Sequence, residues 1–256
     1  MAHYGGVLLP TPTPSTDLEA ARSASLRRRL GLACVIVILV ASNVVSNRMW
    51  PAAYVPWNLG VAAVLLLTAR RAGLSWEQIG LGRGRLRSGV WTGALVAGSV
   101  LVLYAVALAL PATREAFLDR RAAGPLSAVL VAALIRIPLG TVVLEEVAFR
   151  GVLPALVNGH PGGRFWRGAL VSSVLFGLWH ILPSIGITAS NAAVGAALGG
   201  WGVAARCSVA VAAMTAAGLV MMLWRRWGGH LATPAMTHMA TNSAGVLIAW
   251  WLVSGP

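Results

Sequence analysis

The chain has 256 residues, of which 57% are hydrophobic and only 11% are charged, and its mean hydropathy is +0.76. Soluble domains carry about 25% charged residues, so the composition excludes an ordinary soluble domain and indicates an all-α, polytopic membrane protein. The formal net charge of +13 comes entirely from arginine, because no lysine occurs. The arginines are scattered among short loops, which excludes nucleic acid as a partner and suits cations that set membrane topology.

The N-terminal segment, residues 1–26, is polar and contains a Pro-Thr repeat, so we expect a disordered tail. Residues 27–29 are arginines and precede the first apolar run, Leu30 to Val45. A cleaved signal peptide is the alternative. The long tail and the lack of a clear small-residue cleavage site favour a retained first helix. Residues 27–256 are predicted to form a single transmembrane domain.

Further apolar segments follow, each about 20 residues long and therefore able to cross a hydrocarbon core of ~30 Å. A polar connector at 72–88 separates the second segment from the third. The segment 189–205 is rich in Gly and Ala and fits either a full span or a half-inserted piece, so the total is seven or eight spans. The other predicted spans are 52–69, 89–110, 126–156, 168–187, 208–224 and 230–253.

The arginines predict the orientation of these spans. If the first cluster is cytoplasmic, the arginines at 70–71, 83–87, 150, 164 and 167 are cytoplasmic too, in agreement with the positive-inside rule. With seven spans Arg225 and Arg226 also lie inside, whereas with eight they lie outside. The rule therefore favours seven spans. We expect a multi-pass protein of the cell membrane whose surroundings are the lipid bilayer.

Two adjacent acids, Glu145 and Glu146, end a nearly uninterrupted apolar run. A carboxylate costs roughly 2.5–3.5 kcal/mol at a bilayer centre on insertion scales, so such a group indicates a functional site. Glu146 and Arg150 are spaced i,i+4 and can pair on one helix face. A structural ion pair would explain these two residues and leave Glu145 unexplained. Arg136, mid-span, is compatible with a partner of a site carboxylate, a cavity residue or a later start of the span.

Two other predicted helices carry polar groups in apolar surroundings. One holds His180 in the sequence Phe-Gly-Leu-Trp-His, and the other holds His238 and Asn242, which are four residues apart and share a face. Taken singly, each is more typical of a packing residue that hydrogen-bonds between helices. Together with the glutamates they predict a polar cavity inside the bundle.

The chemistry available to this set is hydrolytic. A carboxylate and an imidazole can share a water molecule and remove its proton. A second imidazole and an amide can donate hydrogen bonds to an oxyanion. Glu145, His180 and His238 could equally hold a divalent metal such as zinc, whose bound water would be the nucleophile. The residues alone leave both mechanisms open, and no cofactor is certain.

The order Glu-Glu-x-x-x-Arg, Phe-x-x-x-His and His-x-x-x-Asn resembles the CPBP family of intramembrane proteases, which includes CAAX prenyl endopeptidases and relatives linked to bacteriocin handling. The resemblance covers about residues 126–253. It implies that Glu145 and His180 activate water, that His238 and Asn242 stabilise the oxyanion, and that Glu146 and Arg150 support the site. It also implies a peptide or protein substrate that enters from the membrane and is lipidated or hydrophobic at one end.

Two alternative functions remain at this point. A proton-coupled transporter could use the intramembrane Glu and His residues as a relay, but it should show inverted repeats and we find no clear internal repeat. A non-enzymatic membrane partner or immunity factor could keep the fold and use the polar cluster only for packing. We therefore predict an endopeptidase and keep these two as alternatives. The sequence predicts neither the substrate nor the oligomeric state.

Overall fold

The computed structural model describes residues 14–159 and 164–255, and within them it is all-helical apart from one isolated β-bridge between Asp119 and Asn191. The predicted all-α class is confirmed. The first helix, α1, spans Pro14–Val44 and continues in a π-helical turn, η1, at Val45–Met49. Residues 14–26 of the predicted tail are therefore helical, and residues 1–13 lie outside the described residues.

The next three helices lie outside the predicted site. Helix α2 covers Tyr54–Arg71 and α4 covers Leu86–Ala109. Between them α3 is a single turn, Trp76–Ile79. Ser75 and Gln78 close that turn as a capping box, and Gly80 ends it with φ of 90°, a conformation that costs glycine little. The connector between the second and third spans thus contains a defined turn.

The predicted fourth span is one long helix with two π-helical stretches. Its parts are α6 Leu126–Val131, η6 Ala132–Val142, α7 Val143–Glu145, η7 Glu146–Val152 and α8 Leu153–Asn158. Pro138 lies inside the first π-helical stretch, where a residue without a backbone N–H interrupts the α-helical ladder. Short π segments are frequent at functional sites, and the glutamate pair lies where the second begins. Before this helix, short turns occupy Pro111–Arg114, Glu115–Phe117 and Arg120–Ala122.

The C-terminal part contains three long helices and three short ones. Helix α9, Phe165–Trp179, is followed after a 42° bend by α10, Ile181–Ser184, and α11, Ile187–Ser190. The segment 189–205 contains one complete helix, α12, Ala192–Leu198, between the end of α11 and the start of α13. Seven helical residues extend about 10 Å, so α12 cannot cross a membrane by itself. Helices α13, Val203–Gly228, and α14, Ala232–Ser254, complete the chain.

Within the described residues, five helices are long and apolar enough to cross a membrane, or six if the bent α9–α11 pair is counted as one span. The predicted number of seven or eight spans is not confirmed. Helix α14 is long enough, with 23 residues, but it is not among the five. Its first half carries Thr, His and Asn side chains, which lower its hydropathy.

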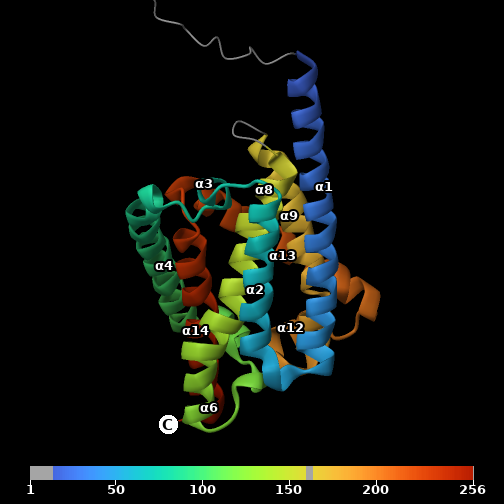
Figure 1. Cartoon of the computed structure of the whole chain (residues 1–256). Coiled ribbons are helices and arrows are strands. Elements are labelled where there is room, and N and C mark those ends of the chain that lie inside the picture. The colour runs from blue at the N-terminus through green and yellow to red at the C-terminus, as the bar shows by residue number, and fades with distance from the viewer. Residues whose placement is uncertain (1–13, 160–163, 256) are drawn as a thin grey trace, which may run out of the picture.

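The long helix from α6 to α8 lies between α2 and α14 (Figure 1). Helix α14 also packs against α4, α9 packs against α13, and α1 packs against α2 and α8. The buried apolar core gathers side chains of α1, α2, the long helix and α9, including Leu65, Leu144, Val152 and Phe176. This arrangement places the glutamate pair in the middle of the bundle.

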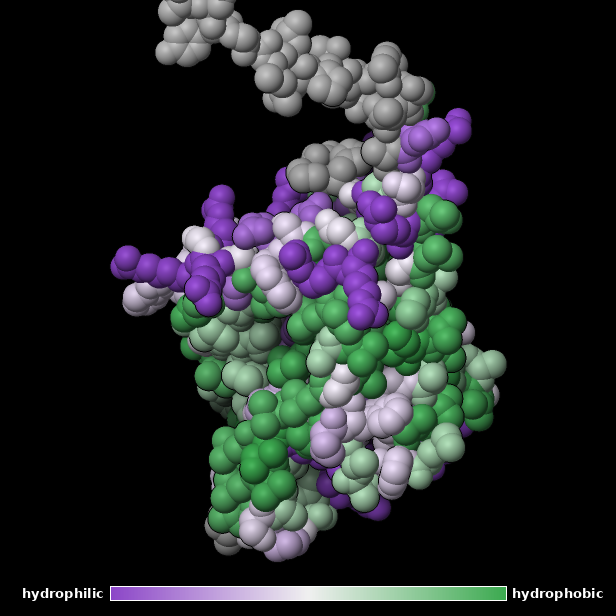
Figure 2. Space-filling model, viewed as in Figure 1, coloured by the Kyte–Doolittle hydropathy of each residue, from purple (hydrophilic) through white to green (hydrophobic). Residues whose placement is uncertain are grey.

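One end of the molecule collects polar side chains, while apolar side chains cover most of the remaining surface in this view (Figure 2). The junction of α13 and α14 lies at this end, because the Leu231 N–H donates to the Gly80 carbonyl oxygen after α3. Arg226 stacks over Phe165 at the start of α9, 4.7 Å from the ring centroid. Arg225 and Arg226 therefore lie at the same end as the arginines around α3. The prediction of seven spans placed Arg225 and Arg226 on the same side as the other arginines. The number of spans itself is not confirmed.

Candidate active site

Glu145 is one of two buried acids, and like Glu146 it has one oxygen without a hydrogen-bond partner among the described residues. Its side chain is almost inaccessible, and the Trp179 indole N–H donates to its Oε1 at 3.0 Å. Its other oxygen, Oε2, is buried and has no hydrogen-bond partner among the described residues. A buried unsatisfied carboxylate oxygen is costly unless the site has a use for it. Glu145 thus presents an oriented acceptor to any water or substrate group that enters.

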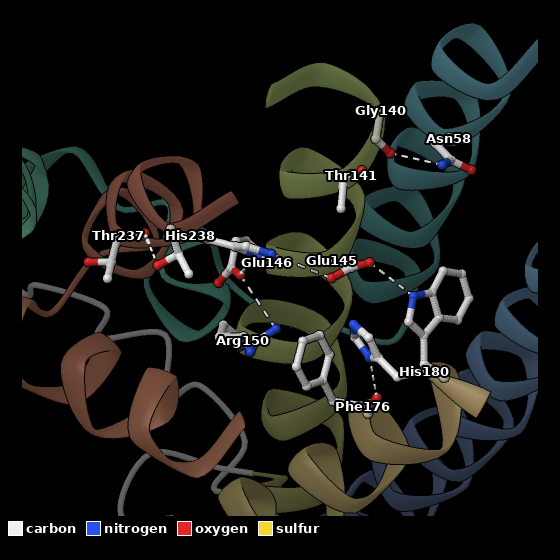
Figure 3. A network of polar contacts seen from close by, with 12 residues as sticks. Asn58, Gly140, Thr141, Glu145, Glu146, Arg150, Phe176, His180, Thr237 and His238 are labelled. Carbon is white, nitrogen blue, oxygen red and sulfur yellow. Dashed lines mark hydrogen bonds and ion pairs between the residues drawn. The ribbon is translucent and has the colours of Figure 1, made fainter. Parts of the chain in front are cut away.

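Glu146 is bound on the other side of the helix. The His238 Nδ1–H donates to its Oε1 at 2.7 Å, and the Arg150 Nη1 lies 3.4 Å from the same oxygen. In Figure 3, dashed lines join Glu146 to Arg150 and Glu145 to His238, while the His180 ring lies on the same side of the long helix as Glu145. The predicted i,i+4 pair of Glu146 and Arg150 is therefore present. The bond from His238 to Glu146 was not predicted.

Arg150 is an unusual partner, because it is only 1% exposed and none of its three guanidinium nitrogens makes a hydrogen bond within the described residues. The 3.4 Å approach to Glu146 is therefore an ion pair without hydrogen-bond geometry. Its guanidinium also lies 3.9 Å from the centroid of the Phe176 ring, where a cation is attracted to the π face. Arg150 balances the charge of Glu146 and connects this helix to α9.

His180 follows directly after α9 and is half-buried. Its Nδ1 lies 2.8 Å from the carbonyl oxygen of Phe176. A carbonyl oxygen only accepts, so Nδ1 carries the proton and the Nε2 lone pair of the neutral ring is left free. Figure 3 shows the ring on the same side of the long helix as Glu145. This tautomer is the one that a base acting through Nε2 requires.

His238 brings α14 to both acids. While its Nδ1 bonds Glu146, its Nε2 lies 3.8 Å from the unbonded Oε2 of Glu145, too far for a hydrogen bond. Asn242 lies one turn further along α14 and is half-buried. No hydrogen bond reaches its amide within the described part of the chain. Contacts therefore connect Glu145, Glu146, Arg150 and His238. His180 and the Asn242 amide make no hydrogen bond or ion pair with these four side chains among the described residues.

Two residues at the site escaped the sequence analysis. Trp179, next to His180, orients Glu145, and the only sequence signal was an indole N–H that needs a partner in an apolar helix. Asn43, near the end of α1, donates its amide to the Trp179 carbonyl oxygen at 2.9 Å. That carbonyl belongs to the last turn of α9, where helical carbonyls lack intrahelical partners. A buried amide in an apolar span was its only signal.

The geometry does not assemble the predicted metal ligands. Among the described residues no group of three His, Cys, Asp or Glu side chains could hold a metal ion. His238 directs one nitrogen to Glu146, and His180 directs one to a backbone carbonyl. The set Glu145, His180 and His238 therefore does not fit a zinc ion as arranged here, and no step below depends on a metal. The predicted polar cavity is likewise not confirmed, since the acids, Arg150 and His238 are each at most 5% exposed.

A comparison with protein families identifies the helices that carry the site. Residues 126–244 match the family model described as type II CAAX prenyl endopeptidase Rce1-like. This segment is Rce1-like. The resemblance indicated by the three motifs is confirmed, and the Rce1-like family implies a peptidase of the CAAX-type intramembrane class. No curated protein and no solved structure matches the chain.

The Rce1-like segment begins at α6 and ends within α14, so it contains both glutamates, Arg150, both histidines and Asn242. The predicted resemblance extended slightly further, to residue 253. Helices α1, α2 and α4 lie outside the match, although all three pack against it. The family and the apolar helices together indicate an integral membrane protein.

Proposed function

We propose that the protein is an endopeptidase of the cell membrane that hydrolyses peptide bonds with a water molecule activated by Glu145. The observation that supports this most directly is the environment of the Glu145 carboxylate, which lacks the arginine partner that Glu146 has. One oxygen is held by Trp179, and the other is buried, unbonded and 3.8 Å from a histidine nitrogen. A general base needs such an oriented oxygen within reach of the proton that it removes.

In the proposed reaction Glu145 accepts a proton from water through Oε2 while the water oxygen attacks the scissile carbonyl carbon. His180 assists with its free Nε2, which accepts a hydrogen bond from the same water. The carbonyl π electrons move to oxygen and form a tetrahedral oxyanion. When the oxyanion collapses, the C–N bond breaks and the proton held by Glu145 passes to the leaving amine. Water is the only co-reactant, and the products are a carboxylic acid and an amine.

The oxyanion is assigned to His238 and Asn242. The Nδ1–H of His238 is committed to Glu146, so the ring is oriented and a proton on Nε2 would be directed to the reaction centre. The Asn242 amide lies one turn further on the same helix and adds a second donor. Removing one such donor in other hydrolases costs about 10²–10³ in kcat.

Glu146 and Arg150 support this arrangement without touching the substrate. Glu146 orients His238 through a 2.7 Å bond, and Arg150 compensates its charge. The substrates that suit a site inside a bundle of apolar helices are peptides that arrive from the bilayer and are lipidated or hydrophobic at one end. The CAAX class named for the family fits this description, since a CAAX cysteine carries a prenyl chain.

The test is cleavage of S-farnesylated CAAX peptides by the purified protein in liposomes. We expect Glu145→Ala and His180→Ala each to lower kcat by about 10²–10⁴, the range of general acid–base catalysis. Glu115→Gln is the matched control, because this exposed acid lies in a turn away from the site. If both site variants cleave as fast as the parent, the proposal fails. A chelator should leave the rate unchanged, and loss of activity that zinc restores would require a metal mechanism instead.

A further inference from the structure

The long helix carries further polar side chains beside those of the candidate active site. A second set continues along the same helix toward α6, on the side that faces α2. It consists of Arg136, Tyr54, Thr141 and Asn58, and we call it the α2 polar strip. Two of its members come from α2, which the family match does not cover.

Contacts connect the members of this strip. Thr141 lies four residues before Glu145, and its hydroxyl is 3.0 Å from the hydroxyl of Tyr54. The Tyr54 ring lies directly against Gly140, where a Cβ atom would approach the ring to 2.8 Å. The Arg136 guanidinium lies over the Tyr54 ring. The strip therefore extends from Arg136 to Thr141, one helical turn before the proposed reacting acid.

Arg136 is the charged end of the strip and has no acidic partner. Its guanidinium lies 4.5 Å from the centroid of the Tyr54 ring, and its side chain is exposed. Among the described residues no carboxylate is within ion-pair distance of it. An arginine stacked on an aromatic ring is held in place while its planar fork remains free, and this fork matches a carboxylate.

Asn58 supplies an independent sign of an unfilled polar position. Its amide nitrogen donates to the Gly140 carbonyl oxygen at 2.8 Å, while its Oδ1 is buried and has no hydrogen-bond partner. The residue is 1% exposed. A buried amide oxygen without a donor is rare in folded proteins. A backbone N–H of an extended peptide lying along the strip would satisfy it.

The length of the strip fits a short C-terminal peptide. Arg136 lies nine positions before Glu145, which is roughly 13 Å at the α-helical rise, and the arginine side chain can shorten this distance. A CAAX sequence is the last four residues of its protein, so any bond cleaved within it lies at most three residues from the terminal carboxylate. Three extended residues span about 10 Å.

We propose that the α2 polar strip is the binding site for the C-terminal end of the substrate, with Arg136 pairing with the terminal carboxylate. This inference rests on the proposed function, since it assigns a substrate group to that same site. It makes α2 a specificity element of the enzyme. It also gives Arg136 a role that the sequence left open.

The test compares an S-farnesylated CAAX peptide that ends in a free acid with the same peptide ending in a carboxamide. Binding of both is measured by fluorescence anisotropy to the Glu145→Gln variant, so that no cleavage is needed. Cleavage of both is measured with the parent. We expect the acid to bind and react at least tenfold better than the amide. Arg136→Gln should reduce this ratio to near one by weakening only the acid, and Arg136→Lys should retain part of it.

Arg114→Gln is the matched control, because Arg114 is also exposed and stacked on an aromatic ring, 5.9 Å from the Trp251 centroid, but lies outside the strip. It should leave the ratio unchanged. Equal weakening of acid and amide by Arg136→Gln would mean that Arg136 only anchors the fold or contacts lipid, and would overturn the proposal. Lack of an acid preference in binding would overturn it too. Preferential binding of the acid without cleavage by the parent would instead overturn the proposed function and leave the carboxylate site standing.

Discussion

The two adjacent glutamates of the long helix have different partners on its two faces. On the α14 face, Glu146 is neutralised by Arg150 and bonded to His238. On the α9 face, Glu145 has one oriented oxygen and one that is buried without a partner. The difference shows that burial alone does not distinguish a structural acid from a reactive one. What distinguishes them is the partner of the bonded oxygen, which is Arg150 together with His238 for Glu146 and a neutral indole for Glu145. The second oxygen of each acid is buried without a hydrogen bond within the described residues.

Substitution of each glutamate by glutamine should separate these two faces most strongly. Glu146→Gln leaves the buried Arg150 without a counter-charge, and breaking a buried pair in this way costs about 3–5 kcal/mol. Glu145→Gln removes a buried charge that has no arginine partner and leaves no buried arginine uncompensated, so we expect little loss of stability. Thermal unfolding in detergent measures both variants. A stable Glu146→Gln variant would show that the Arg150 pair is not structural.

A smaller effect is expected when the α9 face loses its orienting donor. Trp179→Phe removes the indole N–H from Glu145 Oε1 while preserving an aromatic ring against Phe149, whose centroid lies 5.7 Å away. The carboxylate can then rotate, and we expect kcat to fall about tenfold, the equivalent of one hydrogen bond to a charged group. Steady-state kinetics should show kcat reduced more than KM increased. The control is Trp166→Phe, an exposed aromatic on the same helix.

The smallest effect should come from the support behind that donor. Asn43→Leu leaves the Trp179 carbonyl oxygen without the α1 amide that now binds it. A single neutral hydrogen bond contributes about 0.5–1.5 kcal/mol, so we expect a two- to tenfold lower kcat. Asn43→Gln should restore part of the rate by offering the same amide. Ser99→Ala on α4 is the control, since its hydroxyl bonds only its own helix. An unchanged rate in Asn43→Leu would show that α1 does not position the site.

Several helices could be predicted from the sequence, because a segment that crosses a bilayer must be long, helical and apolar. Long apolar segments between arginines predicted the helices 52–69, 89–110 and 208–224 near their observed positions. The segment 189–205 was ambiguous, because Gly and Ala residues provide hydropathy without indicating where a helix ends. Helix α14 shows the opposite problem: its polar residues were read as part of a span, but they keep it below the apolarity of the five candidate spans.

For the candidate site, the sequence predicts Glu145, Glu146, Arg150, His180, His238 and Asn242, because strongly polar groups in apolar helices are costly and indicate a functional site. Their roles in catalysis stay a prediction. It could also pair Glu146 with Arg150, since i,i+4 contacts are local. Only the tertiary structure decided that His238 binds Glu146, that Trp179 orients Glu145 and that Asn43 supports Trp179. These contacts join residues 34 to 136 positions apart, and such contacts depend on how the helices pack, which no short spacing in the sequence encodes.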